Sequence, residues 1–181
     1  SLLKRIQPDG FEDIVAINAL YRPGPMSMNA HLEYADRKNG KTPVYVINKE
    51  LDKKFRGTPV DDILSPTYGL MLYQEQAMQI SRLLCGFTRG QADSLRKAMG
   101  HKIPEEMEAN HKRFIDGAMR LAKEHGWRFS IPDVESLWSY IADFSKYGFN
   151  RSHSVSYAIN AYKTAYLKAH YPRFFMASVL T

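Results

Sequence analysis

Apolar residues recur at helical spacing in one segment after another along this chain, and a glycine or a proline closes most of these segments. Val134, Leu137, Trp138, Ile141 and Phe144 keep close to ideal spacing for a helix with one buried face. The pattern therefore predicts a mainly α fold. The expected helices cover about residues 11–20, 28–38, 74–84, 88–100, 104–126, 130–144, 154–170 and 173–180.

Strand character is slight and is confined to one or two short strands near residues 42–47 and 68–73. The first of these follows Gly40-Lys41-Thr42, which resembles the end of a nucleotide-binding P-loop. That motif requires a glycine where the chain has Ala35, and a helix where it has Pro43. A P-loop is therefore excluded.

Several protein classes are excluded by composition. Cys85 is the single cysteine, so the chain has no disulfide framework, and no run of about 18 apolar residues or signal-peptide core is present. We expect a soluble, cytoplasmic protein without a membrane partner. The formal net charge of +6 favours a polyanionic partner, although a basic surface also serves solubility alone. The chain begins and ends within apolar patterns, which suggests a fragment of a larger protein.

The densest run of functional side chains extends from Lys146 to Ala158. Gly148 is expected to end one helix, and Ser152 or Ser154 to cap the next. A new helix exposes unpaired N–H groups and the positive end of its dipole, which together attract anions. The segment predicts an anion site, with a plain connection between two helices as the alternative. Its candidate residues are Lys146, Asn150, Arg151, Ser152, His153, Ser154 and Tyr157.

A second basic cluster follows the Thr88 and Gln91 capping pattern, and it forms either a phosphate-binding face or a solvated run of charge. The cluster consists of Arg89, Arg96, Lys97, His101 and Lys102. Farther toward the N-terminus, the Pro-Gly-Pro sequence after Arg22 predicts a stiff, extended turn that fixes the direction of this arginine.

Catalytic carboxylates are missing. Metal-assisted phosphoryl transfer requires two or three converging carboxylates, but the chain has no Asp-x-Asp pattern, and Asp61 and Asp62 would point apart on an extended segment. The histidines show no i,i+4 pair on a helix and no cysteine partners. We therefore expect neither a metal site nor a catalytic residue within this chain.

Several longer segments resemble a known family. They are Phe-Glu-Asp-Ile-Val-Ala-Ile-Asn-Ala-Leu-Tyr-Arg-Pro-Gly-Pro-Met from Phe11, Tyr-Gly-Leu-Met-Leu-Tyr-Gln-Glu-Gln from Tyr68, Ala-Asp-Ser-Leu-Arg-Lys-Ala-Met-Gly from Ala92, Tyr-Gly-Phe-Asn-Arg-Ser-His-Ser from Tyr147 and Leu-Lys-Ala-His-Tyr-Pro from Leu167. In this order they resemble the α subunits of bacterial DNA polymerase III, the C-family replicative DNA polymerases. The matching part is the helical fingers domain.

The resemblance implies that residues 1–181 form a single fingers-domain fragment of a DNA-directed DNA polymerase that is inactive in isolation. It implies that the fragment holds no cofactor and that Mg²⁺ and the catalytic aspartates belong to a palm domain outside the chain. The implied partners are primer-template DNA, deoxynucleoside triphosphates, the rest of the polymerase chain and other replicase subunits. The implied triphosphate-binding residues are Arg96, Lys97, Asn150, Arg151, Ser152, His153, Ser154 and Tyr157, with Arg22, Arg89, Lys102 and Lys146 as candidates for DNA or cleft contacts.

Two departures from the family pattern are small. The family commonly has lysine where this chain has His101, and lysine often replaces Arg151. A helical nucleic-acid-binding module without nucleotide chemistry remains the alternative function.

Overall fold

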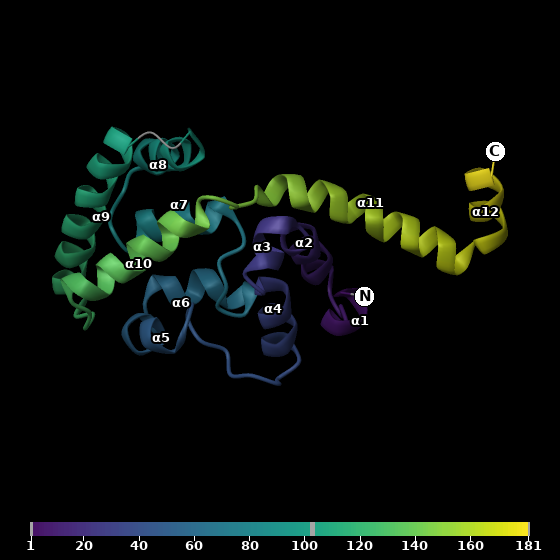
Figure 1. Ribbon diagram of the computed structural model, residues 1–181, viewed down its shortest axis with the longest axis horizontal. Helices are drawn as coiled ribbons and strands as arrows, with labels where there is room; N and C mark the ends of the chain where they lie inside the picture. The colour runs from purple at the N-terminus through teal and green to yellow at the C-terminus, as the bar shows by residue number, and fades with distance from the viewer. Residues whose placement is uncertain (1, 102–103, 181) are drawn as a thin grey trace.

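The computed structural model describes residues 2–101 and 104–180, which form helices joined by short connections and no strand (Figure 1). The mainly α prediction is therefore confirmed. The helices are α1 (Leu2–Ile6), α2 (Phe11–Leu20), α3 (Pro23–Ser27), α4 (Ala30–Lys38), α5 (Lys49–Phe55), α6 (Pro59–Leu64), α7 (Gln74–Leu83), α8 (Arg89–His101), α9 (Pro104–His125), α10 (Ile131–Phe144), α11 (Arg151–His170) and α12 (Pro172–Leu180), with a 3₁₀ turn at Ser65–Thr67.

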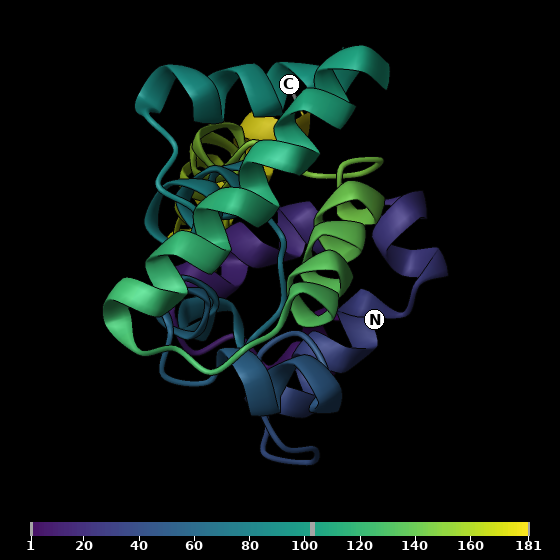
Figure 2. The same ribbon diagram turned by 90° about the vertical axis from the view of Figure 1, so that its left-hand side faces the viewer.

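Two hydrophobic clusters hold these helices together. The larger one gathers buried side chains from α5 to α10, and α9 and α10 lie side by side at its edge (Figure 2). Phe114 of α9 is fully buried there, with its ring 5.2 Å from Trp138 of α10 and 6.4 Å from Phe87 between ring centroids. The smaller cluster joins α1, α2 and α4 to Leu72, Tyr73 and the start of α11.

The spacing-based helix predictions hold best where a cap also fixes the end. Thr88 and Gln91 exchange the predicted hydrogen bonds at the start of α8, at 2.9 and 3.2 Å. At the start of α10 both bonds run in one direction, because the Asp133 carboxylate accepts from the amide and from the hydroxyl of Ser130. Bonds of this kind satisfy amides that a helix leaves unpaired, so they stop it from fraying.

The predicted strands near residues 42–47 and 68–73 are wrong, because an arginine takes the backbone partners that a strand would use. Arg37 is 3% exposed, and its guanidinium donates to the carbonyls of Tyr45, Ile47 and Tyr68 at 2.8 to 2.9 Å. Gly69 follows, where a Cβ atom would lie 1.8 Å from the Tyr45 carbonyl. One backbone bond, from the Ile47 amide to the Gly69 carbonyl at 2.9 Å, joins these two segments, and Tyr73 forms an isolated bridge with Phe149.

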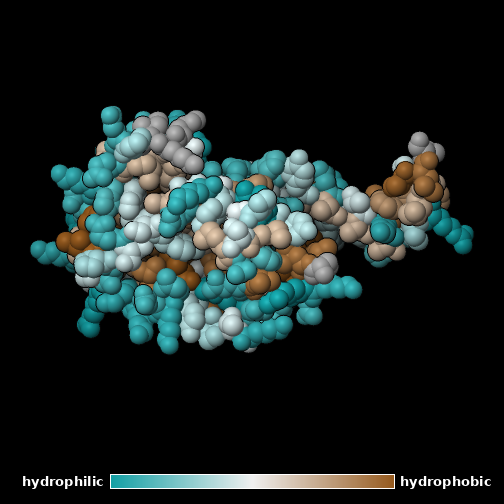
Figure 3. All heavy atoms as spheres, viewed as in Figure 1, coloured by the Kyte–Doolittle hydropathy of each residue, from teal (hydrophilic) through white to brown (hydrophobic). Residues whose placement is uncertain are grey.

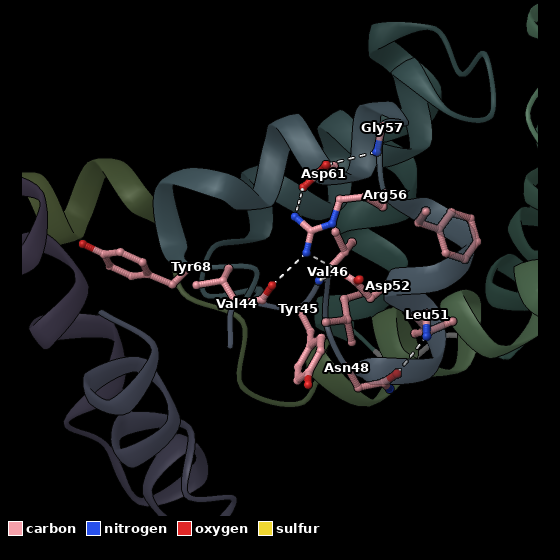
Figure 4. A network of polar contacts seen from close by, with 12 residues as sticks. Val44, Tyr45, Val46, Asn48, Leu51, Asp52, Arg56, Gly57, Asp61 and Tyr68 are labelled. Atoms are coloured by element: carbon pink, nitrogen blue, oxygen red, sulfur yellow. Dashed lines mark hydrogen bonds and ion pairs between the residues drawn. The ribbon is translucent and has the colours of Figure 1, made fainter. Parts of the chain in front are cut away.

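A second arginine fixes the other side of the same irregular segment (Figure 4). Arg56, at the end of α5, donates to the Val44 carbonyl at 2.7 Å and to the carboxylates of Asp52 and Asp61. Asp61 also accepts from the Gly57 amide at 3.0 Å. The neighbouring aspartates Asp61 and Asp62 thus lie in the first turn of α6, and the first of them has a structural role.

The Pro-Gly-Pro segment forms the short helix α3 in place of the predicted extended turn. Pro23 stands at the first helical position, where its missing N–H costs nothing, and the Met26 amide donates to the Arg22 carbonyl at 2.9 Å. The direction of Arg22 is fixed as predicted, but by the start of a helix.

Beyond Ala158, helix α11 extends away from the rest of the molecule, and α12 follows it (Figure 1). The apolar side chains of this part of the helix are not buried, since Ile159, Tyr162 and Tyr166 are 40 to 53% exposed. Hydrophobic residues also gather on the surface of α12 (Figure 3), where Phe174 is 78% exposed. Within the described residues, no helix is both long enough and apolar enough to span a membrane.

Candidate anion-binding site

The start of α7 holds the segment that precedes α11. The Gln74 amide donates to the Phe149 carbonyl at 2.9 Å, and the Phe149 amide donates to the Leu72 carbonyl at 3.3 Å. The Gln74 side chain adds a bond to the Gly148 carbonyl at 3.2 Å. Residues 148–150 are therefore tied to α7 and enter α11 in a defined direction.

Helix α11 begins at Arg151, three residues earlier than predicted, and its N-cap is Asn150. The Asn150 side chain accepts a hydrogen bond from the His153 amide at 2.8 Å. The predicted serine caps are therefore wrong, and Arg151, Ser152 and His153 occupy the first turn of the helix. An amide supplied the cap because its oxygen reaches the third helical N–H as a serine hydroxyl does.

A carboxylate already occupies the N-terminus of α11. Glu75 accepts hydrogen bonds from the Arg151 amide at 3.0 and 3.1 Å and from the Asn150 side chain at 2.9 Å. Negative charge is stabilising at this end of a helix. The anion at this N-terminus is therefore an internal carboxylate.

The Arg151 side chain has a second internal partner. Its Nη2 atom donates to both carboxylate oxygens of Glu12 in α2, at 2.8 and 2.9 Å, and both side chains remain about half exposed. The guanidinium carbon also lies 5.9 Å from the centre of the Tyr73 ring. Arg151 therefore joins α2, α7 and α11 at one point.

Two neighbouring cavities lie along α7, since both are lined by Glu75 and Gln79, and together they are called the furrow. One, of about 410 Å³, includes Glu12, Tyr73 and Arg151; the other, of about 300 Å³, includes Met78, Arg82 and Arg89. The furrow brings together Arg151 and Arg89, two residues that the sequence analysis selected. It adds Arg82, which that analysis missed because a lone arginine on a helix carries no pattern.

Arg82 and Arg89 form no ion pair with any other residue of the described ranges 2–101 and 104–180. Their charges are therefore available to a ligand, whereas the charge of Arg151 is shared with Glu12. One end of the furrow is balanced by internal carboxylates and the other end carries uncompensated positive charge.

The remaining residues of the first α11 turns divide into exposed and buried groups. Ser152, His153 and Tyr157 are exposed, and the His153 ring lies between Phe149 and Tyr157, with centroids 5.5 and 4.7 Å away. Ser154 is fully buried, and its hydroxyl donates to the Val15 carbonyl at 2.5 Å. Ser154 thus belongs to the packing of α11 on α2.

Arg96 and Lys97 lie on α8 and line neither cavity of the furrow. Both pair with Asp93 one turn earlier, at 2.9 and 3.1 Å. The Lys97 ammonium and the Arg96 guanidinium hold the pKa of Asp93 below its usual value. The two basic clusters of the sequence are therefore carried by different helices, and a ligand must bridge them to use both.

Three further candidates differ in their surroundings. Arg22 has a structural role, because it donates to the carbonyls of Ala19 at 3.1 Å and Tyr147 at 2.6 Å. Burial lowers the pKa of its guanidinium. Lys146 is exposed and pairs with Asp143 at 2.7 Å. Lys102 lies outside the described residues.

No group of three or more histidine, cysteine, aspartate or glutamate side chains gathers into a metal-binding set within the part of the chain that the structure describes. The lining of the furrow combines the guanidinium groups of three arginines and the amides of two glutamines with the carboxylates of Glu12 and Glu75. The arginines are the groups that suit an anion.

Replacing Glu75 with alanine is expected to loosen the start of α11, because the Arg151 amide and the Asn150 side chain lose their shared acceptor. By analogy with N-cap losses, the cost is about 0.5–2 kcal/mol of unfolding free energy. Hydrogen exchange at the amides of residues 151–153 measures the local effect. Glu108→Ala, at an exposed site on α9, is the control. Equal protection in both variants would show that Glu75 does not position the helix.

Comparison with known proteins gives consistent matches over the whole chain. Residues 1–122 match the family model of the bacterial DNA polymerase III alpha subunit finger domain. Curated relatives named DNA polymerase III subunit alpha are 51% identical in Saccharopolyspora erythraea, 47% in Mycobacterium tuberculosis and 43% in Escherichia coli K12, each over 180 residues and 99% of this chain. The chain spans 14 to 15% of the length of these relatives.

Proposed function

The chain belongs to the family of bacterial DNA polymerase III alpha subunits, and from this premise we propose that it binds the incoming deoxynucleoside triphosphate and the primer-template during template-directed DNA synthesis. In this proposal residues 1–181 act as a single fingers domain within a cytoplasmic DNA-directed DNA polymerase. Its partners are DNA, nucleotides and the rest of the replicase.

The observation that carries this proposal is the furrow along α7. A triphosphate or a DNA backbone requires several cations on one surface, and the furrow has Arg151, Arg82 and Arg89 along its length. The exposed rings of His153 and Tyr157 contact each other and belong, like Arg151, to the first two turns of α11. Cations for phosphate beside aromatic faces for a base are the combination that a nucleotide requires.

In the same proposal Arg96 and Lys97 meet the ligand from α8. Their pairs with Asp93 are exposed and span one helical turn, so they are weak and easily exchanged for a phosphate contact. Charge that develops on a leaving pyrophosphate is stabilised by such positioned cations.

The magnesium ions of the polymerase reaction are assigned to the part of the polymerase outside this chain. The described residues offer no suitable carboxylate group, so we derive no catalytic step here. The isolated chain is therefore expected to be inactive in primer extension, and its role is to bind and orient the substrates.

The exposed apolar face of α11 and α12 is proposed to pack against the rest of the polymerase chain. Relatives of this protein are far longer, since the chain spans 14% of the Saccharopolyspora erythraea protein. Phe174, Val179 and Leu180 are 63 to 80% exposed, and a cluster of this kind is costly to leave in water. Another part of the same polypeptide is held nearby at high effective concentration, which favours it as the partner.

The double variant Arg96→Ala, Lys97→Ala in the full-length polymerase is expected to lower kcat/KM for nucleotide by about tenfold or more, because two charge-assisted contacts to phosphate are lost. Steady-state primer extension at saturating DNA measures this value. Lys112→Ala, Arg113→Ala on α9 removes the same charge away from the furrow and serves as the control. A helical nucleic-acid-binding module without nucleotide chemistry would instead show weaker DNA binding and an unchanged response to nucleotide.

A further inference from the structure

Tyr73 has a buried hydroxyl without a hydrogen-bond partner. The residue is 2% exposed, and its ring belongs to the lining of the 410 Å³ cavity together with Glu12, Glu75 and Arg151. A buried polar group left unpaired costs about 1–3 kcal/mol, so a protein seldom keeps one without use. The wall of the cavity therefore includes a tyrosine whose buried hydroxyl is an unused donor, next to an arginine.

The position of Tyr73 is fixed by its surroundings. Gln76 accepts hydrogen bonds from the amides of Leu72 and Tyr73 at 2.8 and 3.0 Å, and Tyr73 forms the isolated backbone bridge to Phe149. Burial raises the pKa of Tyr73, so the hydroxyl keeps its proton at neutral pH. The Gln76 side chain is itself buried and holds the tyrosine in place.

Glu12 marks the place of an anion in the same cavity. Both of its oxygens accept from the Arg151 Nη2 atom, as the oxygens of a phosphate do when they bind arginine. Because this pair is half exposed, exchanging Glu12 for another anion costs little. The Glu12 carboxylate thus occupies the position on Arg151 that a phosphate ligand would take.

We propose that the cavity between Glu12, Tyr73 and Arg151 is a phosphate subsite, in which one phosphate of the triphosphate takes Arg151 from Glu12 and accepts a hydrogen bond from the Tyr73 hydroxyl. This inference rests on the proposed function and extends it to two residues, Tyr73 and Glu12. The tyrosine strengthens nucleotide binding, and the glutamate weakens it by competing for the same guanidinium.

The first test separates ligand binding from folding. Tyr73→Phe in the full-length polymerase is expected to raise KM for nucleotide about two- to tenfold, the loss of one hydrogen bond. The melting temperature is expected to stay equal or to rise, because the variant removes an unpaired buried group. Tyr21→Phe, at a site 64% exposed, is the matched control. A Tyr73→Phe variant with lower stability and unchanged KM would overturn the subsite.

The second test concerns competition. Glu12→Gln is expected to lower KM for nucleotide about two- to fivefold, the contribution of an exposed ion pair. Glu108→Gln makes the same change of net charge on α9 and controls for it. The benefit of Glu12→Gln is expected to disappear when Arg151 is also replaced by alanine. If it persists, Glu12 only repels the phosphate and does not compete for Arg151.

Two outcomes distinguish a failure of this inference from a failure of the proposed function. If Arg151→Ala alone leaves nucleotide kinetics unchanged, the proposed role of Arg151 fails. If Arg151→Ala acts but Tyr73→Phe and Glu12→Gln do not, the subsite fails alone. Equilibrium binding of primed DNA is measured for each variant, and an effect confined to DNA would assign the cavity to the DNA backbone and overturn the triphosphate assignment.

Discussion

Arg151→Ala in the full-length polymerase is expected to lower kcat/KM for nucleotide by about 10- to 100-fold, the largest effect on activity of any single substitution in the furrow. Arg151 is the cation at which α2, α7 and α11 meet, and a charge-assisted contact to phosphate contributes about 1.5–3 kcal/mol. The dissociation constant for primed DNA is expected to change far less, because DNA contacts are spread over many cations.

The measurement is single-nucleotide incorporation at saturating DNA, beside equilibrium binding of the same DNA. Lys163→Ala, at an exposed position farther along α11, removes the same charge and should leave both values unchanged. Arg151→Lys retains the charge and is expected to recover most of the activity. Nucleotide kinetics equal to those of the parent in Arg151→Ala would contradict the proposed site.

Phe114→Ala is expected to have the largest effect on stability, about 3–5 kcal/mol of unfolding free energy. The ring is fully buried and contacts Trp138 and Phe87, so its removal leaves a cavity in the larger hydrophobic cluster. Denaturant unfolding followed by circular dichroism measures the change.

Phe174→Ala is the matched control, because this phenylalanine of α12 is 78% exposed and its loss should cost less than about 0.5 kcal/mol in the chain alone. Equal destabilisation by both substitutions would show that α12 is packed in solution. In the full-length polymerase the two effects should become more similar, since α12 is proposed to be covered there.

The helices were predictable because their signals are local. The spacing of Leu137, Ile141 and Phe144 and the Thr88 and Gln91 cap depend on residues within one or two turns, and the structure keeps both. The start of α11 was misplaced by three residues because Asn150 and two serines compete for the same cap, and only Asn150 follows directly after the bonds that tie residues 148–149 to α7.

The failures came from contacts between distant segments. The irregular path of residues 42–47 depends on Arg37, whose guanidinium takes three carbonyls that no local pattern connects with it. The exposure of the apolar face of α11 could not be predicted either, because sequence periodicity shows that a face is apolar but not whether a partner is present in the same chain.

Contacts between distant segments also limited the prediction of the candidate site. Arg151 was found because it lies in a dense run of polar residues, whereas its partners Glu12 and Glu75 are 139 and 76 residues away. Asp13 accepts from the amides of Asp9 and Gly10 ahead of α2, so the Glu12 side chain is not needed there and reaches the furrow.

The contact between α2 and α11 can form only late in synthesis on the ribosome, because its two partners lie far apart in the sequence. Val15 and Ser154, which meet across this contact, are 139 residues apart, so at 5–20 residues per second about 7–28 s separate their synthesis. During that time the side of α2 that packs against α11 remains exposed, and exposed apolar surface on a nascent chain promotes aggregation. We therefore expect a chaperone that shields short apolar helices to bind the nascent chain. Slower translation between Val15 and Ser154 would prolong the time during which the chain requires that chaperone.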